Sequence, residues 1–575
     1  MKKTKRGSQQ RLREGKPGPS ARSRRKRSAS TLFELGAGAS QRTLLAFLRK
    51  THSLGARRRS SSAITYYDTF DWRVHTRDRR VSVHEQDARK QLSIGRVGSN
   101  DVLSMTIDKV PCFASDLPRG PQRRQLEALI KVRRLAPVAE VEVRSDHYAV
   151  LDDERKTVVR IVFERTQMRD PDRVGRDVEL PPTLRVVSMR GYRRAYSKLL
   201  ARLDERSGLE PMSADLEDRA LACLGRDPRP ARSVLDVQLD AGTPIGAAFV
   251  TIHRALFEAM QRNEPGIRAD LDTEYLHEFR VAARRARVFH RIFRDLIRDT
   301  EFDEIVPRIK WLRSVTGPTR DLDVQLLDLA EEREELGDKL DALIPLESLL
   351  REHRHAAWQQ LVDALDSADY EVLRECESKL FELPASSAAR RMSQNGPALG
   401  PWASQRIARA ARRLLKDGRR IDDTAPDAQL HRLRLEGKKL RYLLEFFSSL
   451  YPGKQLRALI RELKKLQDNL GAFNDACVRA DLLHEFASEL ATRGPESAET
   501  VVAVGRLVER AENRKAAERE AFALHFEGFD VPDNRARLRS LFGSGKKDSA
   551  GSEKGDHRKG ADRAATGPSN EGSRS

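Results

Sequence analysis

Two histidines, His277 and His431, each begin a stretch in which basic residues recur once per helical turn. The stretch 277–324 recurs without a gap as 431–478. At about 100° per residue, the basic residues of each copy fall on one side of a helix and the apolar residues on the other. Basic side chains one turn apart, about 5.4 Å along the axis, can follow a chain of phosphates, because each guanidinium binds two oxygens. The duplicated cationic stripe therefore indicates a long polyanion as ligand.

These stripes supply most of the candidate ligand-binding residues. In the first copy they are His277, Arg280, Arg284, Arg287 and Arg291, with Lys310 and Arg313 on the next helix. In the second copy they are His431, Arg434, Lys438 and Arg441, with Lys464 on the next helix and an upstream stripe of Arg406, Arg409, Arg413, Lys416 and Arg420. The apolar faces expected to pack inward consist of Phe279, Ala282, Ala286, Phe289 and Phe293 in the first copy and of Leu433, Leu440, Leu443 and Phe447 in the second.

A plainer interpretation of the stripes is solvation, since Lys and Arg on exposed helix faces usually form intrahelical ion pairs. Ordinary solvation mixes charges of both signs, whereas no acid falls in the first sector before Asp295 at its edge. The second stripe is weaker evidence, because Glu445 falls within it. The two histidines, taken alone, are typical of helix starts or helical cores. Their equivalent placement on two cationic helices makes a ligand role an equal alternative.

A second pair of matching segments, 309–324 and 463–478, follows each stripe. They share Gly317 and Gly471, which we expect to end a helix in the left-handed backbone conformation. They also share Asp321 and Asp475, which we expect to begin the next helix and to orient a neighbouring basic side chain. We predict a structural role for these four residues.

The composition of the 575 residues is that of globular domains with polar tails: 39% are hydrophobic, 34% are charged, and the mean hydropathy is −0.62. No apolar run is long enough for a transmembrane helix, and no apolar stretch follows the basic N-terminus. We therefore expect a cytoplasmic protein without membrane attachment. Four scattered cysteines contain no CxxC pair, so neither a disulfide framework nor a zinc site is indicated. No metal ligand and no cofactor is predicted.

The net charge of +21 is distributed unevenly. Residues 1–30 hold twelve Lys/Arg and one Glu, and residues 543–575 hold seven Lys/Arg and five Asp/Glu. We predict a disordered basic arm over 1–30 and a disordered tail over 531–575. The remaining body is only mildly basic, so the stripes stand out against a surface of mixed charge.

Between the two ends, the pattern changes twice. Residues 31–205 alternate short strand-like runs with helical stretches, which predicts an α+β domain. Residues 206–238, with two X-Pro pairs, are typical of a linker. Residues 239–530 are helical, in two repeats over about 239–390 and 391–530, which we expect to pack around a pseudo-two-fold axis. The predicted strands are 63–67, 80–84, 138–143, 157–163 and 184–188, the predicted helices of the first domain are 41–50, 123–133 and 192–203, and helix breaks are expected at 264–266, 317–318, 401 and 451–453.

Both helical repeats resemble the conserved histidine α-helical domain, CHAD, whose pattern is a histidine followed by R-x-x-x-[RK]-[RK]-x-[RK]. The first copy matches with His277, Arg280, Arg284, Arg285 and Arg287, and the second with His431, Arg434, Lys438, Lys439 and Arg441. The resemblance adds Arg285 and Lys439 to the candidate site. It implies two helical bundles with a basic central surface that binds inorganic polyphosphate. Gly437, in mid-helix, suggests that the second half is the weaker one.

Residues 31–205 resemble, more loosely, a CYTH domain, the β-rich triphosphate tunnel or barrel. Tyr66-Tyr67-Asp68-Thr69 is similar to a YYDT strand end of that family, and Ser197-Lys198 to its closing Ser-Lys. Active members open with E-x-E-x-K, whose carboxylates bind a divalent metal. The opening strand here contains only Glu34, and the similar run at 140–144 is interpreted as alternating strand faces. We therefore predict a degenerate, catalytically inactive domain, in which Glu164 and Glu179 remain as candidate inward carboxylates.

Three functions compete at this point. The first is polyphosphate binding without catalysis, in the cytoplasm and at polyphosphate granules. The second is an inorganic triphosphatase that acts through the CYTH-like domain. The third is nucleic-acid binding, which the 6% aromatic content makes less favoured because no stacking residues are interleaved with the basic ones.

Overall fold

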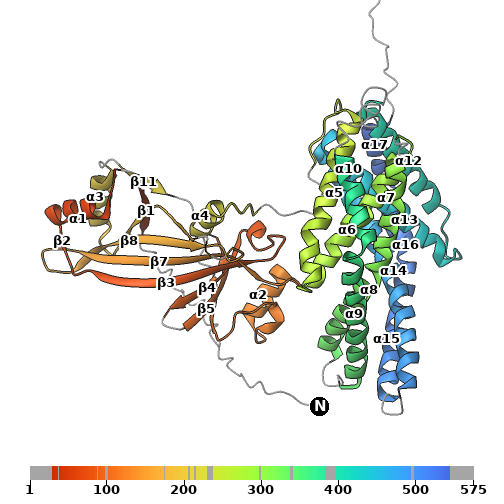
Figure 1. The fold of residues 1–575 in the computed structure, drawn as a ribbon, viewed down its shortest axis with the longest axis horizontal. Helices are drawn as coiled ribbons and strands as arrows, with labels where there is room; N and C mark the ends of the chain where they lie inside the picture. The colour runs from red at the N-terminus through yellow and green to blue at the C-terminus, as the bar shows by residue number, and fades with distance from the viewer. Residues whose placement is uncertain are drawn as a thin grey trace, which may run out of the picture. The chain divides into compact units, whose positions relative to one another are not determined.

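The computed structural model describes residues 29–543, apart from 37, 87–88, 98–101, 174, 176, 205–207, 213–214, 229–236, 297–299, 337–340, 382–396 and 494–497. The predicted basic arm, except its last two residues, and the predicted tail beyond 543 lie outside these residues. The first part of the described chain is rich in strands and the second is helical (Figure 1). This arrangement confirms the predicted α+β class.

An antiparallel sheet forms the first part, in the order β11-β1-β10-β8-β7-β3-β4-β5-β6, with β2 beside β7 and β9 beside β8. Each of the five predicted strands is present. The strands are β1 (Ser30–Leu35), β2 (Ser53–Leu54), β3 (Arg58–Asp68), β4 (Arg79–Gln86), β5 (Arg89–Arg96), β6 (Val102–Ile107), β7 (Ala136–Leu151), β8 (Thr157–Arg169), β9 (Asp177–Glu179), β10 (Thr183–Ser188) and β11 (Leu209–Met212).

Alternating side chains build this sheet. On β7, Val141 and Val143 are buried, whereas Glu140 and Glu142 are not. The predicted alternation of the 140–144 run is therefore confirmed, and it follows from the two-residue period of a strand. Helices α1 (Gln41–Thr51), α2 (Pro121–Ile130) and α3 (Arg193–Asp204) match the three predicted helices. Ser40 caps α1, because its hydroxyl accepts a hydrogen bond from the Thr43 backbone N–H at 3.1 Å.

The predicted linker 206–238 differs from the structure. It contains β11, which pairs with β1, and α4 (Leu216–Cys223), whose Ala220 and Leu221 join a core cluster under the sheet. Strand β11 contains Pro211, but it pairs on one side only, and edge strands tolerate proline. The predicted tail differs as well, since α17 begins at Pro532 and buries Phe542.

Long helices form the second part of the chain. They are α5 (Ile245–Arg268), α6 (Thr273–Phe293), α7 (Thr300–Val315), α8 (Gly317–Leu336), α9 (Ile344–Leu365), α10 (Ala368–Phe381), α12 (Leu399–Gly418), α13 (Asp427–Phe446), α14 (Gly453–Thr492), α15 (Ala498–Glu520), α16 (Phe522–Phe529) and α17 (Pro532–Phe542). None of the helices in the described part of the chain is apolar over a length that would cross a bilayer. All residues of the two predicted apolar faces are buried, with Phe279, Phe289, Phe293 and Phe447 at zero exposure.

The helix break predicted at 264–266 and the helix end predicted at Gly471 are both wrong. Helix α5 continues through Pro265 to Arg268, and α14 runs unbroken through Gly471. Neither Gly317 nor Gly471 is among the described residues with positive φ, so neither forms the predicted left-handed helix end. Gly471 lies between the buried Leu470 and Phe473, and this packing offsets the roughly 1 kcal/mol that a mid-helix glycine costs.

The predicted helix-start aspartates Asp321 and Asp475 do not begin helices, whereas Asp272 directly precedes α6 and Asp427 begins α13. Asp272 accepts a hydrogen bond from the Glu274 N–H at 2.8 Å, as expected of a residue just before α6. Asp475 lies inside α14 and Asp321 inside α8, so neither begins a helix. Asp475 does lie 3.6 Å from the Arg434 guanidinium, in agreement with its predicted role beside a basic side chain.

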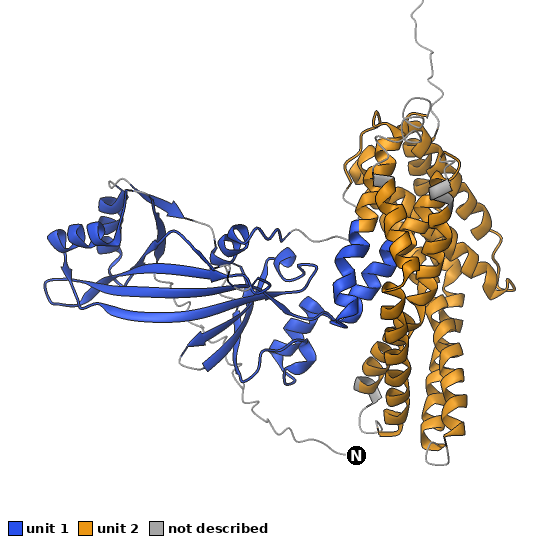
Figure 2. Cartoon of the chain, in the orientation of Figure 1, with its two compact units in different colours: residues 1–233, 258–282 blue, residues 234–257, 283–575 orange. Residues whose placement is uncertain are grey.

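The chain divides into two compact units (Figure 2). Unit 1 comprises residues 1–233 and 258–282, and unit 2 comprises residues 234–257 and 283–575. The elbow between α5 and α6 therefore belongs to unit 1, where the Tyr275 ring stacks on Phe70 with 4.1 Å between centroids. This division differs from the predicted start of the helical domain at 239.

Candidate anion-binding site

A cavity of about 930 Å³ lies in unit 2 among α6, α7, α12 and α13. These helices present their basic faces to it because their apolar faces are buried in the core. The lining residues are Arg284, Arg287, Val288, Arg291, Arg313, Arg413, Asp417, Arg420, Ile421, Gln429, Arg432, Leu433, Leu435, Glu436, Lys438, Lys439 and Tyr442. Two helices that carry matching sequence stripes, α6 and α13, thus contribute to one space.

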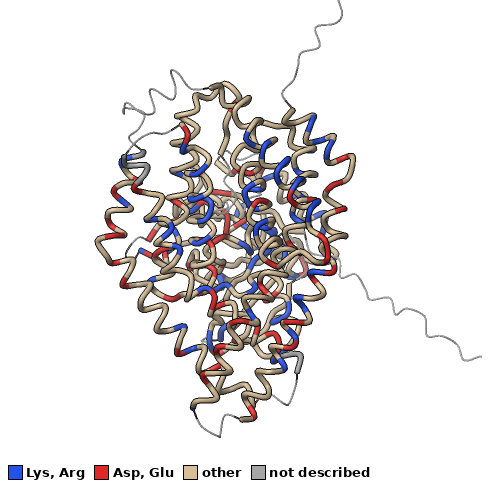
Figure 3. The backbone as a smooth tube through the Cα atoms, turned by 90° about the vertical axis from the view of Figure 1, so that its right-hand side faces the viewer, with Lys and Arg blue, Asp and Glu red and all other residues tan. Residues whose placement is uncertain are grey.

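The charge of this cavity is strongly one-sided. Nine of its lining residues are Arg or Lys, and two are acidic. Both acids lie near the same cation, since the Arg413 Nε is 3.3 Å from Glu436 and 3.6 Å from Asp417. Basic and acidic positions are interspersed along the helices as a whole (Figure 3), whereas the lining of this cavity is mostly basic.

Several cations of the cavity lie within range of each other. Burial, together with Arg284 and Arg434, lowers the pKa of Lys438 to about 7. Burial and the neighbouring Arg287 and Arg284 also lower the pKa of Arg313. Such shifts result when like charges share a partly dehydrated space. Among the described residues, no carboxylate lies within ion-pair distance of the basic side chains of Arg284, Arg287, Arg291, Arg420, Arg432, Lys438 and Lys439.

Some buried polar atoms at the site lack hydrogen-bond partners within the described part of the chain. The Arg284 Nε, the Arg434 Nε and the Tyr442 hydroxyl are buried and have no hydrogen-bond partner among the described residues. A buried donor without a partner costs about 1–3 kcal/mol. An anion with several oxygens would satisfy such donors.

Three candidate residues are engaged elsewhere. Arg285 is 4% exposed and donates to Glu445 at 2.7 Å. Arg441 lies 3.1 Å from the same carboxylate and donates to Gln467 at 3.0 Å. Arg406 donates to Asp295 at 2.9 Å and lies over the Trp402 ring. These three are not lining residues of the cavity, and their contacts support packing roles.

The other candidates lie outside the cavity lining. Arg409 and Lys416 are exposed on α12, Lys310 on α7 and Lys464 on α14. Arg434 is half-buried beside Lys438 and Asp475. The exposed His431 has its Nδ1 2.8 Å from the Asn474 side-chain oxygen. His277 and Arg280 lie on the part of α6 that belongs to unit 1.

Sequence reasoning missed some lining residues, namely Arg432, Gln429 and Tyr442. Arg432 adjoins His431 but lies outside the narrow sector used to define the stripe. A wider sector would have included it, because a long side chain reaches across a helix face. The sequence did not indicate that Tyr442 would line a cavity, since an aromatic residue beside the apolar face of a helix usually belongs to the core.

Unit 1 contains a second polar cavity of about 780 Å³ over the sheet. Its charged lining is balanced, with Arg57, Arg59, Arg144 and Arg165 facing Glu142, Asp146, Asp177 and Glu179. Most of these groups are paired. The Arg57 guanidinium donates to Asp146 at 2.8 Å, and the Arg144 Nε donates to Glu142 at 2.8 Å.

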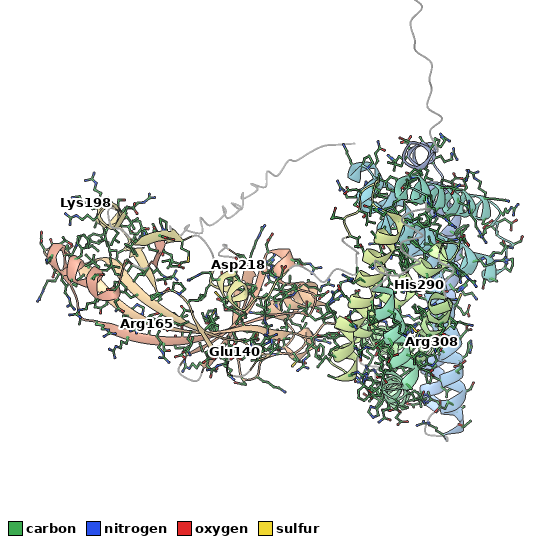
Figure 4. All side chains as sticks on the ribbon, turned by 45° about the horizontal axis from the view of Figure 1, so that its top comes forward. Glu140, Arg165, Lys198, Asp218, His290 and Arg308 are labelled. Carbon is green, nitrogen blue, oxygen red and sulfur yellow. The ribbon has the colours of Figure 1, made fainter. Side chains whose placement is uncertain are left out.

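The residues that resemble the CYTH pattern are also engaged. Glu34 accepts from Arg219 at 3.0 Å, and Glu164 accepts from Arg185 at 2.9 Å. Lys198 lies on α3, away from Glu140 and Arg165 on the strands (Figure 4). In the described ranges no group of three or more His, Cys, Asp or Glu residues is arranged to hold a metal ion.

Comparison with known proteins identifies the helical region. The family model described as CHAD domain matches residues 251–484. The solved CHAD domain from the plant Ricinus communis is similar, with 27% identity and a TM-score of 0.44, over 51% of this chain and 95% of that one. PptA from Streptomyces chartreusis is 20% identical with a TM-score of 0.38, over 50% of this chain and all of that one. A search of curated proteins found no match.

The strand-rich part of the chain is similar to structures of the CYTH type. One is the putative adenylyl cyclase HpAC1 from Hippeastrum, described as having a dominant triphosphatase activity. It is 13% identical with a TM-score of 0.24, over 35% of this chain and 97% of that one. The family model thus places the likeness to the CHAD domain in the helical part of the chain, at residues 251–484.

Proposed function

We propose that the cationic cavity of the CHAD domain binds inorganic polyphosphate without cleaving it. The observation that carries the proposal is the charge imbalance, nine cations against two acids that both lie beside Arg413. A polyanion would relieve the repulsion among these cations and would accept hydrogen bonds from the buried Arg284 and Arg434 nitrogens. The CHAD resemblance implies the same ligand.

The distribution of the cations favours a long chain over a single phosphate. They come from four helices and, for Arg420, from the turn after α12, and they line a volume of about 930 Å³. Arg409 and Lys416 continue the stripe of α12 on the exposed surface beyond the cavity. A flexible phosphate chain can contact successive helical turns, whereas one phosphate can contact only a few of these groups.

The function is tested by the salt dependence of retention on immobilised long-chain polyphosphate. Each phosphate neutralised by Lys or Arg releases a counterion, so affinity falls steeply with salt. We expect a loss of about 1,000-fold or more between 50 and 200 mM NaCl, the range for six or more contacts on a nucleic-acid backbone. Retention that does not change with salt would refute charge-driven binding.

A competition experiment separates polyphosphate from nucleic acid. Long polyphosphate and DNA of equal total charge are offered against labelled polyphosphate. We expect polyphosphate to compete at lower concentration, because narrow rows of cations fit a thin single chain. Equal competition would favour general nucleic-acid binding through the same cations.

The triphosphatase alternative depends on the sheet. Its carboxylates Glu34 and Glu164 pair with arginines, which leaves them poorly placed to bind a catalytic metal. We expect no phosphate release above blank from tripolyphosphate with Mg²⁺ or Mn²⁺. Release that disappears in the Glu164→Gln variant would establish the alternative.

A further inference from the structure

Lys438 occupies an unusual position for a lysine. It lies in the middle of α13, is only partly exposed, and lines the cationic cavity. The groups that face it are Arg284 from α6, Arg434 and Arg441 from its own helix and Asp475 from α14, while Arg313 of α7 and the Arg413–Glu436 pair line the same cavity. Only one of the four groups that act on it directly, Asp475, is negative, and it already lies 3.6 Å from Arg434.

These surroundings favour the neutral amine. Burial and the adjacent arginines lower the pKa of Lys438 to about 7. At neutral pH about half of the Lys438 side chains then carry a free lone pair, against well under about 0.1% for an exposed lysine with a pKa near 10.4. A desolvated lysine beside other cations is a recognised form of activated nucleophile.

The cavity also attracts a particular kind of electrophile. Its guanidinium groups bind phosphate oxygens, and they also stabilise a phosphate that leaves. A small molecule with an acyl group attached to phosphate would therefore place its carbonyl carbon near the Lys438 amine.

We propose that Lys438 is a site of acylation by small acyl phosphates. In the reaction, the lone pair of the Lys438 Nζ attacks the acyl carbon and an N–C bond forms. The bond between the acyl carbon and the phosphate oxygen breaks, inorganic phosphate leaves with the bonding electrons, and the nitrogen loses one proton to solvent. The products are an amide on Lys438 and free phosphate, with no change of oxidation state.

Acylation has a consequence for the ligand. The amide is neutral, so the modified cavity loses one cation and keeps a bulky group at its centre. The predicted loss of polyphosphate affinity rests on the proposed function, whereas the reactivity of Lys438 does not. The two can therefore fail separately.

The test measures acetylation of each lysine by peptide mass spectrometry after treatment of the full chain with acetyl phosphate. Lys454 and Lys464, both exposed on α14, serve as internal references. We expect Lys438 to react at least about tenfold faster at pH 7, with a rate that rises with a midpoint near its lowered pKa. Equal rates at the three lysines, or a midpoint near 10, would overturn the proposal.

The variant Arg284→Gln tests the cause of the reactivity. Removing this positive neighbour raises the pKa of Lys438, so a smaller fraction of the amine is neutral at pH 7. Acetylation should therefore slow at least twofold, even though the smaller glutamine side chain gives the reagent better access to Lys438. A faster reaction in the variant would show that access, rather than the arginine, controls the rate. The uncharged reagent N-hydroxysuccinimidyl acetate should also prefer Lys438, but by a smaller factor, because it gains nothing from anion binding. An equal or greater preference with the neutral reagent would overturn the assignment of acyl phosphates.

The ligand is tested in the same experiment. Long-chain polyphosphate should protect Lys438 and leave Lys454 unprotected. Preferential acetylation without protection would keep the modification site and contradict the proposed function. Protection without preferential acetylation would keep the function and contradict the modification site.

Discussion

Two cavities of similar size lie in this chain, one over the sheet and one among the helices, and they differ in the balance of their charges. The sheet cavity, with a volume of about 780 Å³, is lined by four arginines and four acidic residues. The helical cavity, with a volume of about 930 Å³, is lined by nine basic residues and two acidic residues. In the first, arginines such as Arg57 have carboxylate partners at hydrogen-bond distance. In the second, the two acids both lie beside Arg413.

This difference separates structural arginines from those available to a ligand. A guanidinium paired with a carboxylate has already exchanged its water for a protein partner, and an incoming anion must displace that partner. A guanidinium among like charges has no such competitor. The number of arginines in a cavity is therefore a poor guide to anion binding, whereas the balance with nearby acids is a useful one.

The largest expected effect comes from matched neutralisation of the two cavities. Arg284→Gln, Arg287→Gln and Lys438→Gln together should weaken polyphosphate binding about 1,000-fold, because removing each charge-assisted hydrogen bond to phosphate weakens binding about tenfold. Arg59→Gln, Arg144→Gln and Arg165→Gln remove the same number of basic side chains from the sheet cavity and should change affinity by less than about threefold, since exposed surface charges contribute little. Calorimetric titration measures both. Similar decreases in affinity in the two triple variants would remove the distinction between the cavities.

A smaller effect concerns Arg285, a residue of the family pattern that is paired instead of lining the cavity. Arg285→Met should leave polyphosphate affinity nearly unchanged while it lowers the free energy of unfolding by about 3 kcal/mol, because a buried ion pair loses one partner. Urea unfolding with a binding titration on the same samples measures the two quantities. A weakened affinity with unchanged stability would place Arg285 among the ligand-binding residues.

The pH dependence of affinity is expected to be smaller still. Bound phosphates favour the charged form of Lys438, so its pKa rises on binding and a proton is taken up. Affinity should therefore increase about tenfold as the pH falls from 9 to 7 at fixed ionic strength, and level off below 7 where Lys438 is already protonated. Lys438→Gln should abolish this dependence.

The same titration examines the histidines. A rise in affinity between pH 8 and pH 6 that survives in Lys438→Gln would support the predicted ligand role of His277 and His431. A flat profile in that variant would eliminate it. The contact of His431 with Asn474 provides a structural explanation for such a result.

The smallest expected effect separates affinity from stability. Gly471 lies inside α14 with open space around the position of an added Cβ. Gly471→Ala should stabilise the protein by about 0.5–1 kcal/mol, since alanine is the better helix former. Polyphosphate affinity should not change, because the charge of the cavity is untouched. Destabilisation would restore the original prediction of a helix end at this glycine.

The sequence predicted the elements better than their ends. Periodicity identified the buried faces of α6 and α13, since Phe289 and Leu440 must both leave water. The helix ends predicted from Pro265 and Gly471 were wrong, because packing on both sides of a helix outweighs the local preference of these residues against a helix.

Part of the site was also predictable. The helical wheel alone placed Arg284, Arg287 and Arg291 on one face, and these residues do line the cavity. Carrying over the family pattern added Arg285, which the wheel had placed outside that face and which is buried against Glu445. The ion pairs of Arg285 and Arg406 were not predictable, because their acidic partners lie far away in the sequence and only the folded chain brings them together. The pair of Arg441 with Glu445, four residues further along the same helix, was signalled by the presence of Glu445 in the second stripe.

The most direct test of the charge-balance account is residue-level protection by polyphosphate. The full chain is modified with an arginine-selective dicarbonyl reagent, with and without long-chain polyphosphate, and each arginine is quantified by peptide mass spectrometry. The account predicts that Arg284, Arg287 and Arg420 become protected while Arg59, Arg144 and Arg165 do not. Protection of the sheet arginines, with the three cavity arginines still reactive, would contradict it.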